Sequence, residues 1–142
     1  MPQSSKSGSA VVGELLLSTE QRTQFLDVTA VVGKFVQAAK VASGICHLYV
    51  PHTTAGITIN ENADADVVAD MAATLDRLIP QRPDYRHEEG NSDAHIKTAL
   101  VGTSASVFIT KGELDLGRWQ GIFFCEFDGP RQRKLRVRIV AD

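Results

Sequence analysis

What this chain has little of already narrows its function. In 142 residues there are two cysteines, one tryptophan and only 6% aromatic residues, and no apolar run approaches the roughly 20 residues that a membrane span needs. Cys46 and Cys125 lie too far apart in sequence for a zinc knuckle or a redox pair. We therefore expect two buried thiols in a reducing compartment, and hence a cytoplasmic protein that does not span a membrane.

An excess of positive charge is also missing. The formal net charge is −2 and the sequence pI is about 6.1, so we do not expect general binding to nucleic acid. At 142 residues, 43% of them apolar, the chain is long enough to form one domain with its own core. The Ser-rich residues 1–10 predict a flexible N-terminal leader, and residues 11–142 a single domain.

Hydrophobic periodicity predicts an α+β fold, an antiparallel sheet or sandwich covered by two or three helices. Lys111-Gly112 predicts a hairpin turn, and Gly44 and Pro80 are expected to end helices. The expected helices cover residues 31–39, 62–79 and 93–100. The expected strands cover residues 14–18, 25–29, 45–50, 57–60, 106–110, 113–116, 119–127 and 134–139.

The segment 51–62 combines polar side chains with a strand-like apolar pattern. It contains His52, Thr53, Asn60 and Glu61. A buried polar group without a partner costs about 1–3 kcal/mol, so these residues either lie at an exposed strand end or line a site. The remaining motifs favour a site.

Three histidines fall at the ends of expected elements. His52 follows a strand, His87 lies in a long polar loop, and His95 begins a helix. Imidazoles that converge from different segments bind a divalent metal such as zinc, or else these are scattered surface histidines, since their spacing is not diagnostic. His47 lies within a strand and is expected to be packed and hydrogen-bonded.

Several charged and planar residues are candidates for contact with a substrate. Glu126 shares a strand face with Ile122 and Phe124, so its carboxylate binds either a ligand or metal, or forms an internal ion pair with Arg131 or Arg133. Further candidates for phosphate or ring contacts are Arg131, which follows a tight turn, Lys97, Trp119 and Gln120.

In order and spacing, these motifs resemble the YjbQ-like family, the "secondary thiamine-phosphate synthase" family, from about residue 14 to residue 140. The segments that carry the resemblance are His52-Thr53-Thr54-Ala55, Ile59-Asn60-Glu61-Asn62-Ala63-Asp64, Ala94-His95-Ile96-Lys97, Gly112-Glu113-Leu114, Leu116-Gly117-Arg118-Trp119-Gln120-Gly121-Ile122 and Glu126-Phe127-Asp128-Gly129-Pro130-Arg131.

The resemblance implies a homotrimer and a low-level activity that joins a pyrimidine diphosphate to a thiazole phosphate, giving thiamine phosphate and pyrophosphate. It implies catalytic roles for His52, Glu61, His95 and Glu126, and substrate binding by Thr53, Asn60, Lys97, Trp119, Gln120 and Arg131. The metal prediction comes from the histidines themselves and not from the resemblance: a divalent metal (zinc or magnesium) would be held by His52, His87 and His95. The alternatives are a metal-dependent hydrolase of a phosphorylated or heterocyclic metabolite, and a non-catalytic metabolite-binding protein.

Overall fold

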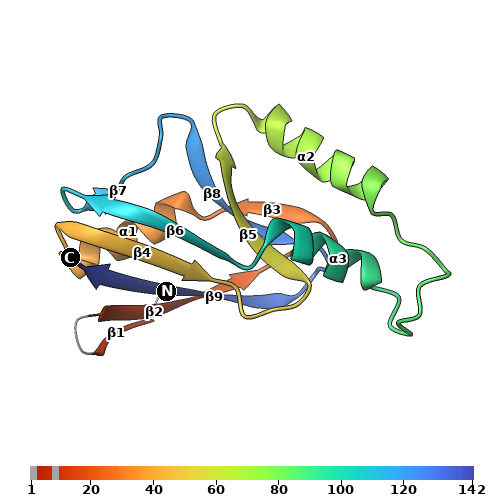
Figure 1. Cartoon of the computed structure of the whole chain (residues 1–142), viewed down its shortest axis with the longest axis horizontal. Helices are drawn as coiled ribbons and strands as arrows, with labels where there is room; N and C mark the ends of the chain where they lie inside the picture. The colour runs from red at the N-terminus through yellow and green to blue at the C-terminus, as the bar shows by residue number, and fades with distance from the viewer. Residues whose placement is uncertain (1–2, 8–9) are drawn as a thin grey trace.

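The computed structural model describes residues 3–7 and 10–142, with side chains from residue 10 onward, and these residues form two packed antiparallel sheets and three helices (Figure 1). The six-stranded sheet has the order β1-β2-β9-β4-β6-β7, and the three-stranded sheet has the order β3-β8-β5. The elements are β1 (Gln3–Ser7), β2 (Ala10–Ser18), β3 (Gln24–Asp27), α1 (Thr29–Ala39), β4 (Ser43–Tyr49), β5 (Ala55–Glu61), α2 (Ala65–Leu78), α3 (Ser92–Val101), β6 (Ser104–Thr110), β7 (Glu113–Leu114), β8 (Gln120–Glu126) and β9 (Gln132–Ala141). The predicted α+β class is confirmed.

The main core lies between the two sheets, and strand alternation explains which residues fill it. In β9, Leu135, Val137 and Ile139 are buried, whereas Arg136 and Arg138 alternate with them on the exposed face. The inner faces of β2, β4 and β6, one side of α1, and the facing residues of β5 and β8 contribute most of the other buried residues. The large sheet is thus covered on one face only, which explains its clear two-residue pattern.

The small sheet is covered on both faces. In β8, Ile122 and Phe124 face the six-stranded sheet, whereas Phe123 and Cys125 join a second apolar cluster with α3 residue Ala94. Figure 1 shows α2 and α3 on this outer side of β5. Burial on both faces explains why β8 reads as a nearly continuous apolar run.

Two local predictions need correction. Gln3–Ser7, within the predicted flexible leader, forms strand β1 and pairs with β2; edge pairing uses backbone hydrogen bonds, which a polar Ser-rich segment supplies as well as an apolar one. Residues 1, 2, 8 and 9 of that leader lie outside the described residues. Gly44 does not end a helix, because α1 already ends at Ala39, and Lys40 after it adopts the left-handed conformation (φ 55°). Instead, Gly44 lies in β4, where a Cβ would come within 2.2 Å of the Val140 carbonyl oxygen.

Other local predictions are confirmed. Lys111 and Gly112 form the β6–β7 turn with φ values of 53° and 81°. Helix α2 begins after Asp64, whose side chain accepts a hydrogen bond from the Asp66 amide, and it ends before Pro80. In the described part of the chain, no helix has the length and apolar character needed to cross a membrane.

Candidate functional site

Strand pairing brings two distant connections together at one end of the small sheet. Ala55, the first residue of β5, pairs with Glu126, the last residue of β8, so the β4–β5 connection lies beside the β8–β9 turn. The loop before α3 and the start of α3 complete an open cavity of about 450 Å³. This His–Arg cavity is lined by Pro51, His52, Thr53, Thr54, His87, Glu89, Asn91, His95, Arg131 and Arg133.

The three candidate histidines all line this cavity, as do Thr53 and Arg131. The rings of His87 and His95 meet edge to face, with centroids 5.5 Å apart. Of the residues to which the sequence analysis assigned a function, these five therefore come together.

A backbone amide fixes the tautomer of His52. Its Nε2 accepts a hydrogen bond from the Lys134 amide at 2.9 Å, so the neutral ring carries its proton on Nδ1. Burial lowers the pKa of His52, and the nearby Arg133 guanidinium lowers it further. The imidazole is consequently neutral near pH 7 and has one N–H to donate.

Glu126 lies beneath the cavity, where its carboxylate binds the guanidinium of Arg133. Its carboxylate is fully buried and accepts hydrogen bonds from Thr19 Oγ1 at 2.7 Å, from Arg133 Nε at 2.8 Å and from the amides of Phe127 and Asp128. Burial alone would raise the pKa of Glu126, but the hydrogen bonds from Arg133, Thr19 and Asp128 outweigh it and leave the pKa below its usual value. Of the two interpretations left open by the sequence, the structure has the internal ion pair, with Arg133 as its partner.

Arg133 was not among the predicted site residues, although it lines the cavity. It is only 6% exposed, and its Nη2 donates to Thr54 Oγ1 at 2.8 Å as well as to Glu126. A signal was present in the sequence: extending the inward-facing series Leu135 and Val137 back by two residues puts Arg133 on the buried face of β9.

Asp128 is a second residue that the sequence analysis missed. Its carboxylate binds Asn91 Nδ2 at 2.8 Å, Arg131 Nη2 at 2.8 Å and Arg22 Nη1 at 3.1 Å. Although burial would raise it, the pKa of Asp128 is lowered by the hydrogen bonds from Asn91 and Arg131. Asp128 therefore fixes side chains from two walls of the cavity.

Helix α3 separates the His–Arg cavity from a second cavity. Asn91 and His95 lie four residues apart and line the first, whereas Asp93 and Lys97, also four apart, line the second. Residues four apart share a helix face, and a two-residue offset turns by about 200°. The second cavity, of about 350 Å³, is lined by Arg22, Thr23, Asp76, Pro80, Gln81, Asp93 and Lys97.

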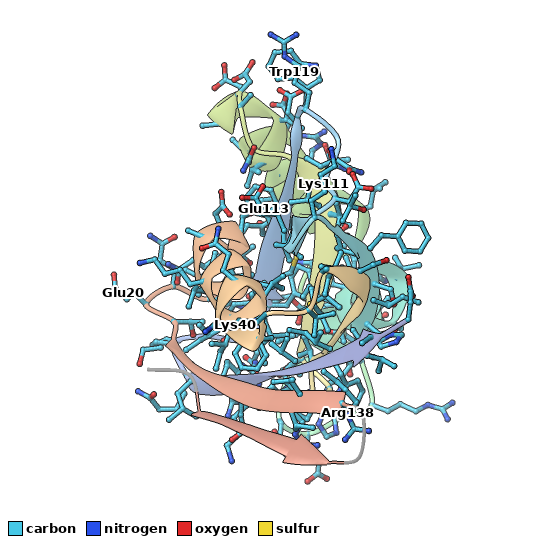
Figure 2. The ribbon with its side chains drawn as sticks, turned by 90° about the vertical axis from the view of Figure 1, so that its left-hand side faces the viewer. Glu20, Lys40, Lys111, Glu113, Trp119 and Arg138 are labelled. Carbon is cyan, nitrogen blue, oxygen red and sulfur yellow. The ribbon has the colours of Figure 1, made fainter. Side chains whose placement is uncertain are left out.

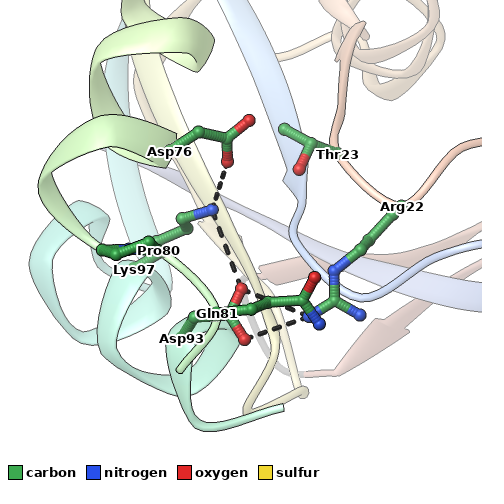
Figure 3. A pocket seen from close by; sticks show the side chains of 7 residues that line it. All are labelled: Arg22, Thr23, Asp76, Pro80, Gln81, Asp93 and Lys97. Carbon is green, nitrogen blue, oxygen red and sulfur yellow. Dashed lines mark hydrogen bonds and ion pairs between the residues drawn. The ribbon is translucent and has the colours of Figure 1, made fainter. Parts of the chain in front are cut away.

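Lys97, a predicted substrate contact, lies in this second cavity. Figure 3 shows its ammonium group between the carboxylates of Asp76 and Asp93, with Arg22 on the far side of Asp93. Lys97 and Asp93 are both nearly fully buried. In this chain Lys97 is thus neutralised by carboxylates and does not line the His–Arg cavity.

Four other predicted site residues lie at the opposite end of the small sheet. Asn60 and Glu61 pair with Gly121 and Gln120, at the end of β5 remote from Thr54. The seven residues of β5 span roughly 20 Å. Trp119 is 55% exposed at the projecting tip in Figure 2, with the Arg118 guanidinium 4.8 Å from its ring centroid. In this chain, Asn60, Glu61, Trp119 and Gln120 do not lie at the cavity, because strand length separates residues that the motif places close in sequence.

The cavity residues do not fit the predicted three-histidine metal site. The Nε2 lone pair of His52 is already occupied by the Lys134 amide. Among the residues with described side chains, no group of three or more His, Cys, Asp or Glu is placed to hold a metal ion.

Comparison with known proteins gives a consistent result. The family model described as "UPF0047 protein YjbQ-like" matches residues 13–142. The UPF0047 protein MJ1081 of Methanocaldococcus jannaschii is 51% identical over 89% of this chain and 91% of its own length. The UPF0047 protein YugU of Bacillus subtilis is 47% identical over 89% of this chain and 96% of its own length.

Solved structures show the same fold. The crystal structure of an uncharacterised conserved YjbQ/UPF0047 protein from Clostridium acetobutylicum matches with a TM-score of 0.87 and 52% identity, covering 89% of this chain and 98% of that one. A YbjQ-like protein of unknown function from Sulfolobus solfataricus matches with a TM-score of 0.89 and 27% identity, covering 94% and 98%. The motifs, the fold and these similarities agree, and the chain belongs to the UPF0047 YjbQ-like family.

Proposed function

We propose that the His–Arg cavity binds the phosphate group of a small metabolite, and that this binding supports low-level formation of thiamine phosphate. The observation that carries the proposal is the pair of guanidinium groups, Arg131 and Arg133, on a cavity that three histidines also line. Guanidinium and imidazole N–H groups are the donors that phosphate oxygens prefer.

Both arginines retain donors for a ligand. Nε and Nη2 of Arg131 bind Asp128, and Nε and Nη2 of Arg133 bind Glu126 and Thr54. Within the part of the chain whose side chains are described, neither Nη1 has a hydrogen-bond partner. The carboxylates thus orient each guanidinium and leave one terminal nitrogen for a phosphate oxygen.

These groups suit the loss of pyrophosphate. In the proposed reaction, the thiazole nitrogen forms a bond to the methylene carbon of the pyrimidine diphosphate. The bond from that carbon to the diphosphate oxygen breaks, and its electron pair leaves with pyrophosphate. Arg131 and Arg133 would stabilise the developing negative charge, and the Nδ1–H of neutral His52 and a ring N–H of His95 would add hydrogen bonds.

The proposed reaction does not require the other residues to which the family resemblance assigned roles. The thiazole nitrogen is itself the nucleophile, so no activated side chain is required. Asn60, Glu61, Trp119 and Gln120 would take part only if a neighbouring subunit placed them near this cavity. Lys97, buried between Asp76 and Asp93, would have no contact with the ligand. A metal-dependent hydrolase, the alternative function, has less support because the three histidines do not fit a shared metal site in one chain.

The experiment that tests this function is titration with pyrophosphate, combined with an assay for thiamine phosphate from its two precursors. Arg131→Gln is expected to weaken pyrophosphate binding about tenfold and to slow product formation at least as much. Arg138→Gln is the control, since Arg138 lies on the exposed face of β9 and projects outward in Figure 2. Pyrophosphate binding without product would favour the non-catalytic binding protein, and unchanged binding in Arg131→Gln would refute the phosphate site.

A homotrimer and a cytoplasmic location are further proposals. The exposed face of the six-stranded sheet carries an apolar patch suited to subunit contact, in which Phe108 pairs with Ile45 and Ile45 pairs with Val140. Phe108 is 66% exposed. Light scattering on the purified protein tests the trimer, and Phe108→Glu is expected to dissociate it if this patch is the interface.

A further inference from the structure

Arg22 lies between β2 and β3 and lines the second cavity, yet it binds Asp128, which orients Arg131 at the His–Arg cavity. Its Nη1 donates to Asp128 Oδ1 at 3.1 Å, and its Nη2 donates to the two oxygens of Asp93 at 3.0 and 3.2 Å. Asp93 is 1% exposed, so Arg22 is anchored to a buried carboxylate (Figure 3). An arginine presents its donors in a planar fork, and here the fork bridges two carboxylates.

The two oxygens of Asp128 have different partners. Oδ2 accepts from Arg131 Nη2 and from Asn91 Nδ2, both at 2.8 Å, whereas Oδ1 accepts from Arg22. Arg131 Nε binds the Asp128 carbonyl oxygen at 2.9 Å, which leaves Nη1 as the Arg131 nitrogen without a partner among the residues whose side chains are described. Without Arg22, Asp128 Oδ1 would lack its donor and would compete for a second nitrogen of Arg131, because arginine and carboxylate favour a two-bond pair.

The backbone around Arg22 holds the same turn. Thr19 donates its amide to the Arg131 carbonyl at 2.9 Å, and its Oγ1 accepts from the Arg131 amide at 2.8 Å. The Arg22 carbonyl accepts from the Gly129 amide at 3.0 Å. A Cβ at Gly129 would come within 2.1 Å of the Gln21 carbonyl oxygen, so glycine lets the two segments approach. The connection between β2 and β3 therefore packs along the turn that carries Arg131.

We infer that Arg22 is a positioning residue for the phosphate site: it occupies one oxygen of Asp128, so that Asp128 orients Arg131 through the other oxygen and Arg131 Nη1 stays available to the ligand. This inference rests on the proposed phosphate site. The paired charges alternate, and Asp128 lies between two cations that compensate it from both sides. Arg22 affects phosphate binding through these two ion pairs and not by contact with the ligand.

Calorimetric titration of the whole protein with pyrophosphate tests this role. Arg22→Met is expected to weaken pyrophosphate binding about fivefold, less than the roughly tenfold loss expected of Arg131→Gln, which removes a ligand donor directly. The double variant shows how Arg22 acts. If Arg22 acts through Arg131, the double variant loses about tenfold in affinity, as Arg131→Gln alone does, whereas independent effects would multiply to about fiftyfold. A substitution that only loosened the fold would weaken binding by the same factor in both backgrounds.

The matched control is Arg82→Met, which removes an exposed arginine that pairs with Asp84 at 2.9 Å and lines neither cavity. It should bind pyrophosphate as the original protein does, and a loss equal to that of Arg22→Met would overturn the inference. Unchanged binding in Arg22→Met, or a fully multiplicative loss in the double variant, would also overturn it while leaving the phosphate site in place. If the unsubstituted protein does not bind pyrophosphate, the proposed function fails, and the inference fails with it.

A second variant covers the case in which Arg22→Met does not fold because buried Asp93 loses its partner. Arg22→Lys keeps a cation beside Asp93, but its single ammonium group has no fork to bridge two carboxylates. We expect Arg22→Lys to fold and to bind pyrophosphate more weakly than the original protein. Full pyrophosphate affinity in Arg22→Lys would overturn the inference.

Discussion

Replacing Glu126 by glutamine tests the buried ion pair beneath the cavity. The substitution preserves the side-chain shape but removes the charge that compensates Arg133, which is only 6% exposed. The new side-chain NH2 group would also face hydrogen-bond donors, because Thr19, Arg133 and two backbone amides all donate to Glu126. Removing one partner of a buried pair costs about 3–5 kcal/mol of the free energy of unfolding.

For a chain of this length, the loss corresponds to a fall in the melting temperature of roughly 10–15 °C. The measurement is urea denaturation of Glu126→Gln at pH 7. Glu14→Gln is the matched control, because Glu14 pairs with Arg136 on the exposed sheet face at 3.4 Å. A surface pair of this kind contributes about 0–1 kcal/mol, so the control should unfold almost as the original protein does.

A double variant, Glu126→Gln with Arg133→Met, completes the cycle. With both charges removed, no buried guanidinium is left uncompensated, and we expect the double variant to be more stable than the sum of the two single effects predicts, by about 2 kcal/mol. A loss below about 1 kcal/mol in Glu126→Gln, or strict additivity in the cycle, would refute the view that Glu126 holds Arg133 in place.

The remaining predictions concern pH, the strand tip, metal content and the thiols. Because folding lowers the pKa of His52, the neutral ring contributes to stability above about pH 6.5, and this contribution is lost as the pH falls toward the native pKa. The urea midpoint should therefore fall less between pH 7 and 5.5 in His52→Gln than in the original protein. An equal fall in both proteins would contradict this. Trp119→Ala should leave pyrophosphate affinity unchanged by titration, because Trp119 does not line the cavity; a tenfold loss would show that a neighbouring subunit brings it there. Elemental analysis should find less than one metal ion per chain both before and after His95→Ala, since no three-ligand group is seen in the described part of the chain; stoichiometric zinc that His95→Ala removes would contradict this geometry. Burial raises the pKa of both Cys46 and Cys125 to about 12, so the disulfide reagent DTNB should label them only after unfolding, and labelling of the native protein would show that one is accessible.

Local patterns predicted much of the fold and part of the site. The two-residue alternation of β9 and the turn at Lys111-Gly112 depend on neighbouring residues, and both are as predicted. The same alternation correctly put Glu126 on the face of Ile122 and Phe124. Strand β1 was missed because edge pairing leaves little trace in side-chain polarity.

The composition of the His–Arg cavity could not be read in the same way. Thr54 and Arg133 are separated by 79 residues, and they meet because β5 pairs with β8 and β9 follows after a short turn. By contrast, Trp119 lies only seven residues from Glu126, but an intervening extended strand carries it to the other end of the sheet. Closeness in sequence therefore does not bring Trp119 to the cavity within one chain.

By itself, the sequence determined the family, the α+β class, the faces of β8 and β9 on which Glu126 and Leu135 lie, and the histidines and arginines that became candidates for a site. These properties follow from local periodicity and residue chemistry, which need no knowledge of the fold. Only the tertiary structure decided that Arg133 joins Arg131 at the cavity and that Lys97 is neutralised on the opposite face of α3. Strand register and helix rotation set which side chains meet, and both depend on contacts between residues distant in sequence.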